Sequence, residues 1–93
     1  MRIELKKFGN TLISRQSGRE ALAAFQPMLR TIDSTESIEV DFEGVLTFSP
    51  SWADEFLTPL ENQFKDRFVL LPSTNPSVQI TLEILAEGKQ RRG

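Results

Sequence analysis

The sequence predicts a small α/β fold in which helices pack on a mostly parallel sheet of about four strands. Residues 38–43 alternate between apolar and acidic side chains, the period of two expected for a strand with one buried face. Residues 52–64 carry a large apolar side chain at every fourth position, which is the spacing of one buried helix face. Residues 67–71 are largely apolar, as in a buried strand. Strand, helix and strand in this order predict a right-handed crossover with parallel strands.

Residues 2–6 also alternate, and they predict the first strand of the sheet. This strand ends at Phe8-Gly9-Asn10, which is a turn signal because glycine adopts positive φ freely and asparagine tolerates it. Leu12-Ile13 then predicts a short return strand.

A helix is expected after the short strand, and either Ser14 or Ser17 can cap it. Pro27 lies inside this helix, where it removes one N–H donor and crowds the carbonyl of Ala23. We therefore expect a kink at Pro27 or an irregular last turn that begins near it. The predicted buried face consists of apolar residues at helical spacing, namely Leu22, Phe25, Leu29 and Ile32.

The strand of residues 37–42 and a loop lead into a second helix that is expected to run from residue 50 to about Lys65. Pro59 interrupts its interior, so this helix is expected to bend or to end early around Thr58. Residues 67–71 are expected to form a central strand that helices cover on both faces.

Asn75-Pro76 predicts the start of a third helix, because asparagine is a favoured cap and proline is favoured at the first helical position. Its inner face is expected to carry Val78, Leu82 and Leu85, and Gly88 is expected to end it. Residues 1–88 thus form one predicted domain, and residues 89–93 form a short polar tail.

Charge and composition exclude several classes of function. The net charge is −2 with both signs interspersed, and the only cationic cluster, Lys89 with Arg91 and Arg92, lies at the end of the chain. Such a chain offers no basic field for a nucleic-acid backbone. No apolar run approaches the roughly 20 residues that span a bilayer, and charge interrupts the N-terminus at once. We therefore expect no signal peptide, no membrane association and a cytoplasmic location.

The chain contains no histidine, cysteine or tyrosine. It therefore lacks the side chains of a Ser-His-Asp triad, a thiol nucleophile, an ordinary zinc site or a redox pair. An enzyme would need Ser49 or Ser51 as a nucleophile beside Lys65 or Asp54, and no nucleophile motif surrounds either serine. We expect a protein without enzymatic activity, cofactor or metal.

The most informative segment is the helix start at residues 49–55. In open α/β sheets ligands and modifications often occur there, because a helix N-terminus offers unpaired N–H groups and a partial positive charge. Ser51 and Asp54 fit a capping box, and Ser49-Pro50 fits a second cap. Both caps cannot begin the same helix, so one serine is available as a phosphoacceptor or partner contact.

Two further features of this segment each allow more than one interpretation. Trp52 shares a helix face with Phe56, so it is either a core residue or, if exposed, a strong partner anchor. Asp54 and Glu55 are adjacent and point in different directions on a helix, which argues against a catalytic carboxylate pair or a metal site. Solvation or capping explains these two acids.

Arg15 and Arg19 stand one helical turn apart, so together they can grip a phosphate or pair with Glu20 and other surface acids. The first interpretation predicts a small-anion or nucleotide-binding module at the same helix N-terminus. Gly18 between them is expected to permit close packing, because no phosphate-binding loop pattern surrounds it.

Two motifs, Val40-Asp41-Phe42-Glu43-Gly44-Val45 and Ser49-Pro50-Ser51-Trp52-Ala53-Asp54-Glu55-Phe56, resemble the STAS-like domain of unknown function, a small bacterial family. Residues 12–20 also resemble the helix-opening pattern of that family, so the similarity covers most of residues 1–87. More distantly, the chain is similar to STAS domains of anti-sigma factor antagonists, in which a strand ending in Asp leads to an Asp-Ser-Ser-Gly element. The resemblance implies a small STAS-like sandwich.

In those antagonists a partner kinase that is also the anti-sigma factor phosphorylates the second serine. On this pattern Asp41 takes the acidic position of the strand, and Ser51 takes the phosphoacceptor position. Here Ser49 replaces the loop acid, Pro50 replaces the preceding serine and Trp52 replaces the glycine.

The resemblance therefore implies a regulatory, partner-switching domain that docks a histidine-kinase-like ATPase or an anti-sigma-type regulator. The expected docking region is the loop and helix start at residues 49–55, while the oligomeric state stays open. The candidate contacts are Ser49, Ser51, Trp52, Asp54 and Glu55.

Overall fold

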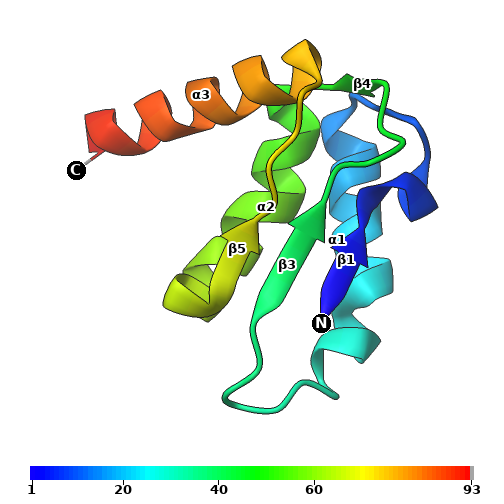
Figure 1. Ribbon diagram of the computed structural model, residues 1–93, viewed down its shortest axis with the longest axis vertical. Coiled ribbons are helices and arrows are strands. Elements are labelled where there is room, and N and C mark those ends of the chain that lie inside the picture. Colours follow the sequence, from blue (N-terminus) through cyan, green and yellow to red (C-terminus); the bar gives the residue numbers. More distant parts are fainter. Residues whose placement is uncertain (93) are drawn as a thin grey trace.

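The structure is a computed structural model that describes residues 1–92, with the side chains of residues 1–88. These residues form three helices and two parallel sheets of three and two strands, so the predicted α/β class is confirmed (Figure 1). The elements in chain order are β1 (Arg2–Glu4), the 3₁₀ helix η1 (Leu5–Phe8), β2 (Thr11–Leu12), α1 (Arg15–Leu29), β3 (Ile38–Asp41), β4 (Thr47–Phe48), α2 (Pro50–Phe64), the 3₁₀ helix η2 (Lys65–Arg67), β5 (Phe68–Leu70) and α3 (Pro76–Arg92).

The larger sheet has the strand order β1-β3-β5, and both strand pairs are parallel. The two crossovers move along the sheet in the same direction, and right-handed crossovers then place α1 and α2 on the same face. Figure 1 shows both helices behind the sheet. Ile3, Ile38 and Val40 point toward them and are buried, whereas Glu39 and Asp41 alternate with them and stay partly exposed.

Strand β5 does not take its predicted position. The sequence predicts a central strand covered on both faces, but β5 is an edge strand and β3 is central. Val69 is 39% exposed, and its neighbours Phe68 and Leu70 are only partly buried. Both crossovers move in the same direction along the sheet, so β5 is the last strand and has only one neighbour. Both crossover helices cover the same face of the sheet, so neither of them covers the opposite face of β5.

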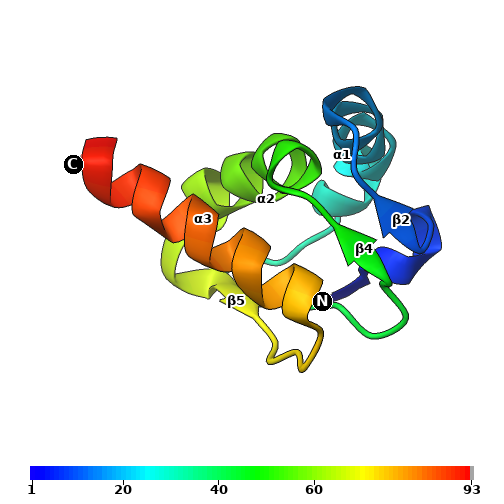
Figure 2. The same cartoon turned by 90° about the horizontal axis from the view of Figure 1, so that it is seen from above.

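The smaller sheet joins β2 to β4, with Thr11 opposite Thr47 and Leu12 opposite Phe48 (Figure 2). The predicted short strand at residue 12 therefore exists, but it pairs in parallel with β4 and does not return along β1. Strand β4 lies in a segment that the sequence predicts as a loop. The Asn10 carbonyl accepts hydrogen bonds from two N–H groups at the start of β4, at 2.8 and 3.1 Å.

The helix α1 begins after Ser14, whose Oγ accepts a hydrogen bond from the Ser17 N–H at 3.0 Å. Ser14 is therefore the cap, and the alternative cap at Ser17 is wrong. The helix continues past Pro27 and ends at Leu29, so Ile32 lies beyond the helix and packs against the core from the following loop.

The helix α2 runs to Phe64, so the expectation that it ends early near Thr58 is wrong. A proline inside a helix costs roughly 3 kcal/mol, because a hydrogen bond is lost and the ring crowds the preceding turn. Beyond Pro59, the helix still buries Leu60 and Phe64, and each fully buried side chain of this size contributes roughly 1.5–3 kcal/mol. Burial of these two residues therefore offsets the cost of the proline.

The helix α3 begins as predicted, since Asn75 Oδ1 accepts a hydrogen bond from the Ser77 N–H at 2.8 Å. The predicted inner face is also confirmed, because Val78 is buried while Leu82 and Leu85 pack against the core. The helix continues to Arg92, so Gly88 does not end it. Gly88 lacks the positive φ of a glycine that terminates a helix. The predicted cationic cluster of Lys89, Arg91 and Arg92 lies outside the described side chains.

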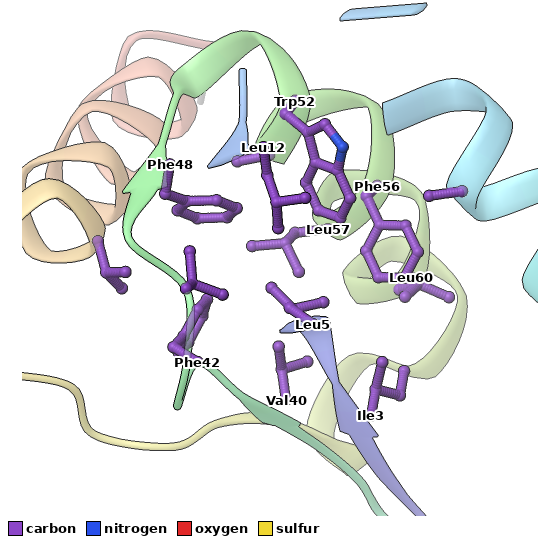
Figure 3. Close-up of a cluster of buried hydrophobic side chains, with 14 of the residues drawn as sticks. Ile3, Leu5, Leu12, Val40, Phe42, Phe48, Trp52, Phe56, Leu57 and Leu60 are labelled. Atoms are coloured by element: carbon purple, nitrogen blue, oxygen red, sulfur yellow. The ribbon is translucent and has the colours of Figure 1, made fainter. Parts of the chain in front are cut away.

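The core fills the space between the inner face of the larger sheet and the helices α1 and α2 (Figure 3). The predicted buried face of α2 is confirmed, because Trp52, Phe56, Leu60 and Phe64 are all buried. The rings of Trp52 and Phe56 stack with their centroids 4.9 Å apart, and Phe48 of β4 approaches Trp52 at 5.8 Å. Aromatic packing with β4 thus holds the start of α2 against the core.

Candidate functional site

Ser49 joins the start of α2 to the loop before α1. Its Oγ accepts a hydrogen bond from the Trp52 N–H at 3.3 Å and donates one to the Ile13 carbonyl at 2.6 Å. Because Ser49 is the cap, the predicted capping box of Ser51 and Asp54 is wrong. Ser51 instead lies inside the first turn of the helix.

Ser51 lines a surface cavity of about 230 Å³ between α2 and α3. Its side chain is half-buried, and no other described residue makes a hydrogen bond to its hydroxyl group. The hydroxyl is therefore available to solvent or to a partner. The cavity is lined by side chains from all three helices, namely Arg15, Pro50, Ser51, Asp54, Thr58, Ile84 and Leu85, together with Gly88.

Arg15 connects α1 to the same helix start through ion pairs. Its Nη1 lies 3.2 Å from Asp54 Oδ2 and 3.0 Å from Glu55 Oε1, and Arg19 Nη2 lies 3.7 Å from the same Glu55 oxygen. The predicted pairing of both arginines with surface acids is confirmed, although Glu20 is not their partner and accepts a hydrogen bond from Gln16 instead. The hydrogen bonds to Glu55 and then to Asp54 raise the pKa of the Arg15 guanidinium.

The convergence of two adjacent acids on one guanidinium follows from the position of α1. Asp54 and Glu55 are adjacent and so leave α2 in different directions, but α1 packs closely against the start of α2, where its Arg15 reaches both acids. Asp54 is held in addition by the Thr58 hydroxyl, which donates a hydrogen bond to Oδ1 at 3.0 Å. Sequence spacing describes one helix at a time, so it did not predict that a second helix would bring these acids together.

Gly18 explains how the two helices come so close. A Cβ atom at this position would lie 2.7 Å from the Trp52 carbonyl oxygen and 3.1 Å from the Trp52 Cα. The prediction that Gly18 permits close packing is therefore confirmed. Arg15 and Arg19 flank this glycine, so the close contact places both guanidinium groups over the start of α2.

Trp52 is only 1% exposed, which confirms its interpretation as a core residue. As a buried residue it offers no surface to a partner, so its role as an exposed anchor is wrong. Other apolar side chains are exposed at this end of the molecule: Ile13 is 51%, Ile80 57% and Ile84 45% exposed. Their exposure was not predicted from the sequence, although Ile80 and Ile84 are four residues apart and lie off the buried face of α3.

Asp41 lies at the end of β3, where its Oδ1 accepts a hydrogen bond from the Glu43 N–H at 3.0 Å. It supports this turn and does not line the cavity beside Ser51. Among the described residues, no group of acidic side chains is arranged to hold a metal ion. None of the helices in the described part of the chain combines the length and the apolar character needed to cross a membrane.

Comparison with known protein families places part of the chain in a family. The family model of the STAS-like domain of unknown function matches residues 25–79, which is more than half of the chain. The matched range contains β3, the start of α2 and both Ser49 and Ser51. It does not include residues 12–20, so their resemblance to the family stays a prediction. Comparison with curated proteins and with solved structures gave no match.

Proposed function

Since the chain belongs to the family of STAS-like domains of unknown function, we propose that it is a non-enzymatic regulatory domain that docks a protein partner through the start of α2. The proposed partner is a kinase-type ATPase or an anti-sigma-type regulator. The observation that carries the proposal is the position of Ser51, which is not needed as a cap and opens into a cavity beside exposed apolar side chains.

The surface around Ser51 has the composition of a protein-docking surface. Ile84 lines the cavity together with Ser51, and Ile80 precedes it by one helical turn on α3. Ile13 lies beside the helix start, where its carbonyl accepts a hydrogen bond from Ser49 Oγ. Exposed isoleucines that surround a polar centre are favourable contacts for a partner, because covering them removes apolar area from water. We name Ile13, Ser51, Ile80 and Ile84 the docking surface.

Phosphorylation of Ser51 would act on this surface as a switch. The kinase would transfer the γ-phosphoryl group of ATP to Ser51 Oγ, with release of ADP and of the hydroxyl proton. The phosphate adds roughly 1.5 to 2 negative charges at neutral pH and must lose its hydration when an apolar partner surface covers it. The modified domain would therefore release its partner.

A small-anion or nucleotide-binding module is the alternative that the sequence leaves open. It would use Arg15 and Arg19 as anion contacts, but both guanidinium groups are already paired with Asp54 or Glu55. A free anion would have to displace these carboxylates without the high effective concentration of a group attached to the protein itself, so protein docking is the function that the geometry favours.

The test is the effect of a negative charge at Ser51 on partner affinity. A photo-crosslinking amino acid at Ile84, expressed in the native host, would identify the partner, and its Kd would then be measured for purified variants. We expect Ser51→Asp to weaken binding at least about tenfold, equivalent to about 1.4 kcal/mol, and Ser51→Ala to bind like the wild type. Ser34→Asp, in an exposed loop, serves as the matched control and should leave Kd unchanged.

Equal affinities of the wild type and Ser51→Asp would show that the switch is wrong. Equal losses with Ser51→Asp and Ser34→Asp would attribute the effect to net charge and would equally reject a specific role of Ser51.

A further inference from the structure

Arg15 and Ser51 share one cavity although they come from different helices. Ser51 precedes Asp54 by three residues and Glu55 by four, so the three side chains are neighbours on the surface of α2. Arg15 contacts both of these carboxylates, at 3.2 and 3.0 Å. Its guanidinium group is therefore held beside the cavity that Ser51 also lines.

The ion pairs of Arg15 are of the exchangeable kind. The Arg15 side chain is about half-exposed, and ion pairs in such positions are weak because water and salt screen them. A phosphate carries more charge than a carboxylate and offers three acceptor oxygens, to which a guanidinium can donate two parallel hydrogen bonds. The partial positive charge at the start of α2 also favours an anion at this position.

We infer that Arg15 binds the phosphate of phosphorylated Ser51, and that its guanidinium group leaves Asp54 and Glu55 to do so. This inference rests on the proposed phosphorylation of Ser51 and adds its mechanism. The exchange keeps the arginine in the cavity and removes it from the two acids, so the phosphate and both carboxylates then face a partner as one acidic surface. Release of the partner thus depends on the altered pairing of Arg15 as well as on the charge added to Ser51.

The exchange can be tested without the native kinase. Phosphoserine is installed at position 51 by genetic encoding, and its second pKa is measured by ³¹P NMR titration of the full chain. A guanidinium contact stabilises the dianion, whereas the charges of Asp54 and Glu55 disfavour it, so we expect this pKa to be lower in the wild type than in Arg15→Gln. Arg15→Lys should lower it less than arginine does.

Arg19→Gln is the matched control, because Arg19 stands one turn further along α1, pairs with the same Glu55 and does not line the cavity. This variant should keep the lowered value. The inference is overturned if Arg15→Gln leaves the phosphoserine pKa unchanged, or if Arg19→Gln raises it by as much. Both arginines are exposed, and circular dichroism of each variant confirms that the fold is retained.

The titration of the phosphoserine at position 51 and the partner-affinity test of the proposed function can fail independently of each other. Because the phosphoserine is genetically encoded and needs no kinase or partner, failure of the exchange leaves partner binding and the Ser51→Asp result unaffected. An unchanged partner affinity for Ser51→Asp would reject the proposed function without changing the titration of the installed phosphate.

Discussion

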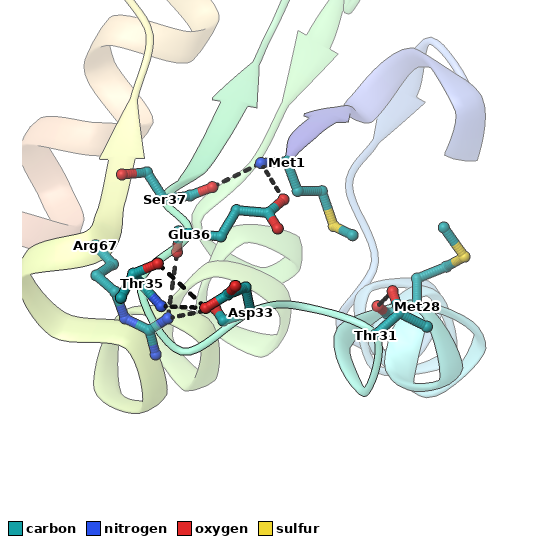
Figure 4. Close-up of polar contacts among 8 residues, drawn as sticks. All are labelled: Met1, Met28, Thr31, Asp33, Thr35, Glu36, Ser37 and Arg67. Atoms are coloured by element: carbon teal, nitrogen blue, oxygen red, sulfur yellow. Dashed lines mark hydrogen bonds and ion pairs between the residues drawn. The ribbon is translucent and has the colours of Figure 1, made fainter.

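Arg15 and Arg67 form polar clusters at different ends of the molecule, and their partners differ in kind. Arg15 binds carboxylates, whereas Arg67 Nη1 donates hydrogen bonds to the backbone carbonyls of Asp33 and Glu36 at 3.1 and 3.2 Å (Figure 4). The Arg67 guanidinium also lies over the Phe64 ring, 5.2 Å from its centroid. A carboxylate can be replaced by another anion, but a backbone carbonyl cannot leave without unfolding its loop.

The Arg67 cluster is strengthened by the chain terminus. The Met1 ammonium donates a hydrogen bond to the Ser37 carbonyl at 2.7 Å and lies 2.8 Å from Glu36 Oε2. Asp33 Oδ1 accepts hydrogen bonds from both the N–H and the hydroxyl of Thr35, at 3.0 and 3.1 Å. These contacts hold the connection between α1 and β3. One arginine cluster therefore holds a loop, while the other is suited to exchange its partners.

The largest expected effect is on the helix contact that creates the Arg15 cluster. Gly18→Ala places a Cβ against the Trp52 backbone, so α1 and α2 must separate, and we expect a loss of about 1–3 kcal/mol in the free energy of unfolding. Urea denaturation measures this loss. Gly88→Ala is the matched control, because nothing lies within 4 Å of its new Cβ and alanine favours the helix by roughly 1 kcal/mol. A Gly18→Ala protein as stable as the wild type would contradict the close contact.

The two arginines themselves should differ in their contribution to stability. Arg67→Ala leaves two backbone carbonyls without their charged donor, and we expect a loss of about 1–2 kcal/mol. Arg15→Gln removes exposed ion pairs that typically contribute below about 1 kcal/mol, so its effect on unfolding should be small. Thermal denaturation of both variants in the same buffer compares their losses of stability. Equal losses would remove the distinction between a structural and an exchangeable arginine.

The smallest expected effect is a dependence on acid pH at the Arg67 end. The hydrogen bond from the Met1 ammonium, followed by its charge, lowers the pKa of Glu36 below the ordinary value of 4.5. Glu36 therefore contributes stability above pH 4.5, and this contribution is lost as pH falls through the lowered pKa.

Glu36→Gln should be less stable than the wild type at neutral pH, and the difference should shrink below pH 4.5. Urea midpoints measured at several pH values would show this convergence. Glu83→Gln, exposed on α3, is the control and should follow the wild type throughout. A difference for Glu36→Gln that stayed constant with pH would exclude the ion pair as its cause.

Local patterns predicted most of the helices and the parallel sheet. Alternation around Val40 and the fourfold spacing from Trp52 to Phe64 identify faces that become buried, and Asn75-Pro76 marks a helix start that the structure confirms. The edge position of β5 and the short strand β4 were not predictable in this way. Both depend on which distant segment lies alongside, and an apolar run reads the same in a central strand and at an edge.

The candidate site divides in the same manner. Spacing alone indicated a helix start with two serines, and only the contact of Ser49 with Ile13 decided which serine caps the helix. The cavity that contains Ser51 exists because α1 and α3 both approach α2 there, and no single segment of the sequence encodes it.

By itself, the sequence determined the class of fold, the buried faces of the helices and the absence of imidazole and thiol chemistry, since these depend on residue type and local period. The tertiary structure decided that Trp52 is buried, that Asp54 and Glu55 share Arg15, and that Ile84 rather than Trp52 offers apolar surface beside Ser51. The physical reason is that burial and ion pairing are properties of neighbours in space, and the helix crossing at Gly18 supplies those neighbours.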